Sequence, residues 1–100
     1  MEYAEPATFP AIGQRLRLLR MALMPRSSRA QFARLVRLSR TTWVKCEIGT
    51  ARLSLTTALV LHQKFGVSLD WVYLGDGRTM PQELMMRIAA LEQGDQEPEK

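Results

Sequence analysis

The sequence predicts an all-α protein: a domain of five helices with an additional C-terminal helix. Apolar residues recur at spacings of three and four along most of the chain, which is typical of helices with one buried face. Serine precedes several of these segments and glycine follows them, as at helix ends. No segment has a convincing strand pattern. We expect a disordered arm at residues 1–10, the domain at 11–77, the C-terminal helix at 78–92 and a disordered acidic tail at 93–100.

The first helix is expected at residues 12–23 and the second at residues 29–36. Pro25 ends the first helix and Ser28 can cap the second. Ala33 is small enough to let a neighbouring helix approach closely. The side chains expected to face inward are Ile12, Leu16, Leu19 and Leu23 from the first helix, and Phe32, Leu35 and Val36 from the second.

The third helix is expected at residues 40–47, after a short turn. Ser39 is its natural N-cap, and Gly49 can end it in a left-handed conformation. Trp43 and Cys46 are three residues apart and therefore share a face, which we expect to be buried.

Three further helices are expected after this one. The fourth spans residues 55–65 between Ser54 and Gly66, a short fifth follows Ser68, and the sixth spans residues 81–91. Their expected apolar stripes are Leu55, Ala58, Leu59 and Leu61 on the fourth helix, and Leu84, Ile88 and Leu91 on the sixth.

Charge is distributed unevenly along the chain. The net charge is +4, yet residues 10–66 carry eleven Lys and Arg and one acid, Glu47. Residues 67–100 carry three basic and seven acidic residues. This pattern favours a basic half that binds a polyanion such as nucleic acid, followed by an acidic region that is solvated or faces a partner.

Several classes of function are not expected. The chain has one cysteine, Cys46, and one histidine, His62, which excludes an intramolecular disulfide and gives no metal-ligand set. No nucleophile, base and orienting group lie together, so we expect no enzyme and no cofactor. The N-terminus lacks an apolar signal core, and apolar runs are too short for a membrane span.

The second and third helices together suggest a helix-turn-helix, in which the second helix of the pair enters the major groove of DNA. Arg40 can make a bidentate contact to guanine, and Thr41 can offer a hydroxyl or a methyl group. Ser39 leaves the N–H end of the helix free to face a phosphate. The outward face at helical spacing comprises Arg40, Thr41, Val44 and Lys45.

Residues 12–75 resemble the Xre family of helix-turn-helix regulators, which includes lambda repressor and the Cro proteins. The segments "IGQRLRLLR", "SRAQFARLVRLSRTTWVKCEIG" and "FGVSLDWVYLGDG" carry the resemblance through their order and spacing. It implies a lambda-repressor-like domain that binds double-stranded DNA as a homodimer on a near-palindromic operator. It also implies a bacterial or phage-derived protein of the cytoplasm, associated with the nucleoid.

The resemblance also implies roles for individual residues. Arg20 and Glu47 match an ion pair between the first and third helices. The sequence departs from the family at Arg37, where glycine is common, so that Arg37 adopts a left-handed conformation at a cost of roughly 1 kcal/mol or the turn differs. Trp43 replaces an aliphatic residue, which implies a repacked core. The implied base contacts are Arg40, Thr41, Val44 and Lys45, and the phosphate contacts are Arg29, Ser39, Thr42 and Arg52.

Three functions remain open at this point. We expect a transcriptional repressor that blocks polymerase; the alternatives are an antitoxin that also binds a toxin protein, and an interaction module that no longer reads DNA. The stripe on the sixth helix can fold back on its own core or pair with a second chain. We favour dimerisation through Leu84, Ile88 and Leu91, because one domain presents one recognition helix.

Overall fold

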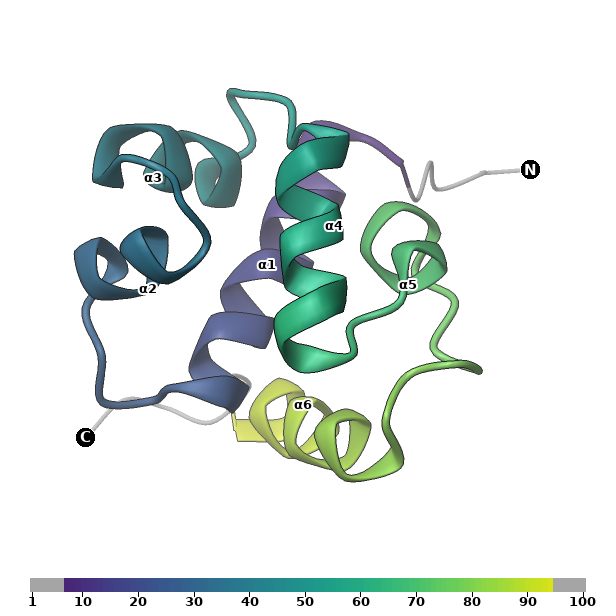
Figure 1. Ribbon diagram of the computed structural model, residues 1–100. Coiled ribbons are helices and arrows are strands. Elements are labelled where there is room, and N and C mark those ends of the chain that lie inside the picture. Colours follow the sequence, from purple (N-terminus) through teal and green to yellow (C-terminus); the bar gives the residue numbers. More distant parts are fainter. Residues whose placement is uncertain (1–6, 95–100) are drawn as a thin grey trace.

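The computed structural model describes residues 7–94, and this part of the chain is all-helical, as the sequence predicts (Figure 1). Helices α1 and α4 lie at the centre, with α2 and α3 on one side, α5 on the other and α6 across one end. Most of the predicted N-terminal arm and C-terminal tail falls outside the described residues. The helices are α1 (Phe9–Leu23), α2 (Arg29–Leu35), α3 (Arg40–Ile48), α4 (Leu55–Phe65), α5 (Leu69–Leu74) and α6 (Gln82–Gly94).

Local signals set the helix ends. The hydroxyls that cap α1 to α5 each accept a hydrogen bond from the backbone N–H three residues further on; they belong to Thr8, Ser28, Ser39, Ser54 and Ser68. Helix α1 begins at Phe9, earlier than predicted, because Thr8 caps it and Pro10 occupies its first turn. Helix α6 extends to Gly94, so it includes the first two residues of the predicted tail.

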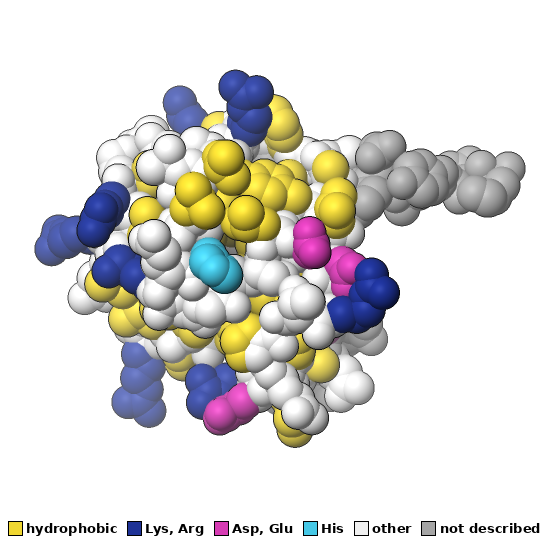
Figure 2. Space-filling model, turned by 45° about the vertical axis from the view of Figure 1, so that its right-hand side comes forward, with side chains coloured by type: hydrophobic (Ala, Val, Ile, Leu, Met, Phe, Trp, Pro, Cys, Tyr) yellow, Lys and Arg dark blue, Asp and Glu magenta, His cyan; other side chains and the backbone are white. Residues whose placement is uncertain are grey.

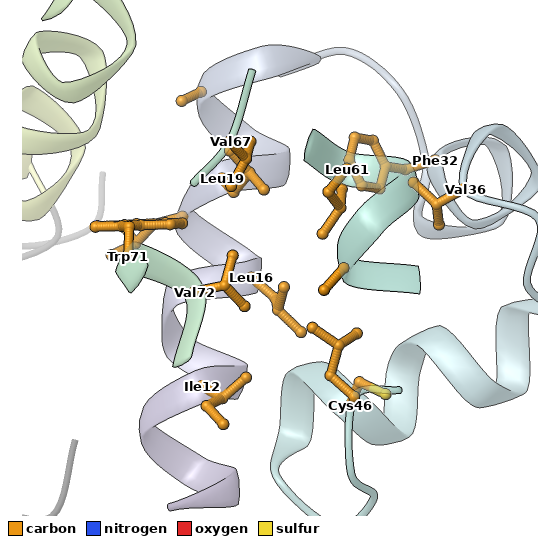
Figure 3. Close-up of a cluster of buried hydrophobic side chains, with 14 of the residues drawn as sticks. Ile12, Leu16, Leu19, Phe32, Val36, Cys46, Leu61, Val67, Trp71 and Val72 are labelled. Atoms are coloured by element: carbon orange, nitrogen blue, oxygen red, sulfur yellow. The ribbon is translucent and has the colours of Figure 1, made fainter. Parts of the chain in front are cut away.

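The core lies between α1 and the helices around it. Leu16 and Leu19 of α1 lie beside Val67 and Val72, while Phe32 and Val36 face α4 (Figure 3). The ring of Phe32 packs against Trp43, with ring centroids 5.0 Å apart, and against Phe65, at 5.9 Å. Trp43 is fully buried in this arrangement, so the large residue is accommodated by packing against another aromatic side chain.

Three of the residues predicted to face inward are exposed instead. Leu35 lies on the outer side of α2, and Leu55 and Leu59 lie on a face of α4 that the rest of the described chain leaves open. The predictions for these three residues were wrong because the face that a helix turns toward its neighbours depends on how the helices pack together, which the pattern of a single helix does not define.

The prediction that Leu84, Ile88 and Leu91 form a dimer surface requires correction. Helix α6 folds back against α1, where Leu84 and Ile88 are buried in the chain's own core and Leu91 is partly buried against it. Leu84 and Ile88 therefore stabilise this domain and are not available to a second chain.

Candidate nucleic-acid interface

A short hydrogen-bonded turn joins α2 to α3. Arg37 lies in this turn in the left-handed region, with φ 66°, so of the two alternatives left open by the sequence the structure has the left-handed residue. The N–H of Leu38 donates to the carbonyl of Ala33, at 2.9 Å, and closes the turn. Ala33 itself is fully buried, which agrees with its expected role in close helix packing.

Helix α3 has one exposed face and one buried face. Arg40, Thr41 and Lys45 are exposed and Val44 is half-buried, as a face available for DNA contact requires. On the opposite side, Trp43, Cys46 and Glu47 are buried against the domain.

Three of the residues to which the resemblance gives phosphate contacts lie at the surface. Ser39, Thr42 and Arg52 are all exposed. The hydroxyl of Ser39 accepts the N–H of Thr42, at 3.1 Å, and donates to the Thr42 hydroxyl, at 3.0 Å. These two side chains therefore stabilise the start of α3, and any phosphate contact would be added to this cap.

Glu47 joins three helices through one carboxylate. The Arg20 guanidinium of α1 donates from Nε to Oε2, at 2.6 Å, and from Nη2 to Oε1, at 3.2 Å, which confirms the predicted ion pair. Arg29 of α2 donates from Nε to Oε1, at 3.1 Å, and Trp43 of α3 donates its indole N–H to Oε2. We call these four residues the Glu47 hub; its geometry fixes α3 relative to α1 and α2.

The electrostatics of the hub keep Glu47 ionised. Burial alone would raise the pKa of this carboxyl, but the hydrogen bond and charge of Arg20, with hydrogen bonds from Arg29 and Trp43, outweigh that effect and lower it. The sequence analysis missed Arg29 and Trp43 as partners of Glu47. Trp43 was recognisable, because it lies four residues before Glu47 and so shares its side of the helix.

Glycine allows α1 and α3 to touch backbone to backbone. A Cβ added at Gly13 would lie 2.4 Å from the carbonyl oxygen of Glu47 and 2.5 Å from that of Cys46. Both distances are far below van der Waals contact, so any side chain at Gly13 would push α3 away from the domain. The sequence analysis did not assign a role to this glycine.

A basic cleft of about 430 Å³ opens beside the start of α3. Arg40 of α3 and Arg29 of α2 line it together with Ser27 and Ser28 from the preceding loop. Arg17, Arg20 and Met21 of α1 and Pro25 complete the lining, so four arginine residues line one concave site. Two of them, Arg20 and Arg29, also donate to Glu47. Such a site attracts an anionic oxygen ligand, and fork-shaped guanidinium groups suit phosphate. Arg17 was not singled out from the sequence.

Metal binding and thiol chemistry have little support in the part of the chain that the structure describes. Residues 7–94 contain no group of three or more His, Cys, Asp or Glu placed to hold a metal ion. Cys46 is buried, and burial raises the pKa of its thiol, which disfavours the reactive thiolate. The ring of His62 contacts the carbonyl oxygen of Val67 through Nδ1, at 3.0 Å.

Among the described residues, none of the helices is long and apolar enough to span a membrane. No family model, curated protein or solved structure matches this chain.

Proposed function

We propose that this protein is a sequence-specific regulator that binds double-stranded DNA with α3 in the major groove. On this proposal α2 and α3 form a helix-turn-helix within a lambda-repressor-like domain, and a homodimer binds a near-palindromic operator. The observation that supports it most is the exposed face of Arg40, Thr41 and Lys45 on a helix whose other face is fixed by the Glu47 hub.

The chemistry of the side chains separates phosphate contacts from base contacts. The basic cleft and the N-terminal end of α3 would hold backbone phosphates and set the register of the protein on the duplex. Arg40 and Lys45 would donate to guanine O6 and N7, and Thr41 would contact a base or a thymine methyl. Bound across a promoter, such a protein would act as a repressor by excluding polymerase.

The rigidity of α3 bears on sequence selectivity. Base contacts discriminate only if their donors keep a fixed position relative to the phosphates that set the register. The Glu47 hub and the close approach at Gly13 provide two independent attachments of α3 to α1. These two attachments can hold the exposed face of α3 in a fixed position without a long helix or a separate domain.

Fluorescence anisotropy on duplex DNA tests the proposal with two charge-matched variants. Arg40→Ala with Lys45→Ala removes two positive charges from the reading face, and Lys64→Ala with Arg87→Ala removes two from exposed positions on α4 and α6. At about 1–3 kcal/mol for each of the two base contacts, the first variant should bind specific DNA more weakly by roughly thirtyfold or more. The second should stay within about threefold of the unmodified protein. Equal losses in both variants would contradict the assignment of α3 as the reading helix.

A further inference from the structure

Ile48 is an exposed apolar side chain in the last turn of α3. It is 65 % exposed, the largest exposed fraction among the large apolar side chains of residues 7–94. An isoleucine so exposed buries little apolar surface within the domain, and its β-branched side chain makes it a poorer helix former than lysine, arginine or glutamine. Neither burial nor helix stability therefore explains isoleucine at this position.

The spacing of Ile48 along α3 places it on the exposed face of that helix. Thr41, Val44 and Ile48 are three and four residues apart, so their side chains form one stripe along a helix with 3.6 residues per turn. Thr41 and Ile48 are exposed and Val44 is half-buried. Lys45 lies beside this stripe, and Trp43 lies on the opposite, buried side of the helix. The stripe therefore presents methyl groups from three β-branched side chains next to a cation.

The surroundings of the stripe favour DNA over an apolar protein surface as its partner. Three exposed leucines, Leu55, Leu59 and Leu74, lie on α4 and α5, where Figure 2 shows hydrophobic side chains gathered. The stripe on α3 has Lys45 beside it instead, and Arg40 at the start of the same helix, both exposed. Two cations beside a row of methyl groups suit the major groove, which is flanked by phosphates and carries the C5-methyl groups of thymine.

We propose that Ile48 determines part of the sequence specificity by contacting the C5-methyl group of a thymine. This inference rests on the proposed function. Among the four bases only thymine has an apolar group at its major-groove edge, so this contact selects one base pair. From Thr41 to Ile48 the stripe extends about 10 Å along the helix axis, the length of about three base steps. Ile48 therefore faces a different base pair from Arg40 and Thr41, about three positions away.

Uracil substitution tests the contact, because uracil is thymine without the methyl group. A duplex enriched by the unmodified protein from random sequences is remade with uracil in place of one thymine at a time. Fluorescence anisotropy then gives the affinity for each duplex. Since burying one methyl group is worth about fourfold in affinity, at least one position should show a loss of about fourfold.

Ile48→Ala shows whether this loss depends on Ile48. Alanine removes the apolar end of an exposed side chain and favours the helix, and circular dichroism verifies the fold. At the sensitive position Ile48→Ala should bind thymine and uracil duplexes equally. Met86→Ala is the matched control, because Met86 is 64 % exposed on α6, and it should keep the fourfold difference.

A second substitution in the DNA separates the methyl group from the hydrogen-bonding pattern of the base. Cytosine at the sensitive position lacks the methyl group, and 5-methylcytosine returns it at the same C5 atom. The change from cytosine to 5-methylcytosine should strengthen binding of the unmodified protein by about fourfold and leave the affinity of Ile48→Ala unchanged.

The outcomes distinguish this inference from the proposed function. Equal binding of thymine and uracil duplexes at every position, or a difference that Ile48→Ala retains, would overturn the inference and leave the proposed function standing. Loss of the difference in Met86→Ala as well as in Ile48→Ala would also overturn it. If the protein enriched no duplex at all, the proposed function would be rejected, and this inference with it.

Discussion

The substitution Glu47→Gln tests whether the Glu47 hub holds the domain together. Glutamine keeps the size of the side chain and one acceptor oxygen, but it removes the negative charge and points an N–H₂ group toward cationic donors. Arg20 would then be left largely buried without an anionic partner. We therefore expect a loss in the free energy of unfolding that is clearly larger than the loss from a substitution at an exposed position.

The magnitude follows from burial. The Glu47 side chain is 3 % exposed, and breaking a buried ion pair by removing one partner costs about 3–5 kcal/mol. Because one acceptor remains, and because Arg29 can turn toward solvent, we expect the lower end, about 3 kcal/mol. For a domain of this size that corresponds to a fall in Tm of at least 12 °C or so.

Urea unfolding followed by circular dichroism measures this loss. Glu83→Gln is the matched control. Glu83 also pairs with an arginine, Arg87, but its side chain is 80 % exposed. The control should lose less than about 0.5 kcal/mol. If Glu47→Gln were no more destabilising than Glu83→Gln, the hub would not carry the attachment of α3 that we assign to it.

Three further predictions concern the pH dependence of stability, the contact between α1 and α3 at Gly13, and the turn at Arg37. The pKa of Glu47 is lowered on folding, so its contribution is present above the unfolded value of 4.5 and is lost as pH falls through the folded pKa. Urea unfolding at neutral pH and at about pH 3 should therefore show a larger loss for the unmodified protein than for Glu47→Gln; equal losses would contradict this. Gly13→Ala should cost about 3 kcal/mol or more in the same assay, whereas Gly94→Ala, with nothing within 4 Å, should be neutral or slightly stabilising. Arg37→Gly should stabilise by up to about 1 kcal/mol by relieving a positive φ, while Arg34→Gly inside α2 should destabilise by about the same amount; destabilisation by both would exclude strain at Arg37.

Helix positions were predictable because their signals are local. Ser28, Ser39 and Ser54 cap the helices that follow them, and Gly49 and Gly66 end helices in left-handed conformations, all as the sequence indicates. A cap needs only a hydroxyl and a nearby N–H, so it can be recognised without knowing the rest of the fold. The start of α1 was placed too late because the expected apolar stripe began at Ile12, after the capping Thr8.

The helix faces were less predictable, because they depend on neighbours distant in sequence. The stripe on α6 suits burial against its own domain and burial against a second copy equally well, and only the position of α1 decides between them. Leu55 and Leu59 satisfy a helical pattern for burial but lie on an open face. In the candidate site, the exposure of Arg40 and Lys45 could be predicted from the pattern of α3. The position of Arg17 in the lining of the cleft could not, because it depends on how α1 packs beside α2 and α3.

Selection of bound duplexes from a pool of random sequences tests the central claim most directly. The account predicts that the unmodified protein enriches one motif with two inverted half-sites about one helical turn apart. The variant with Arg40→Ala and Lys45→Ala should lose that motif or change its bases. If no motif is enriched, or if the variant enriches the same motif as strongly, α3 does not read DNA sequence and the account is contradicted.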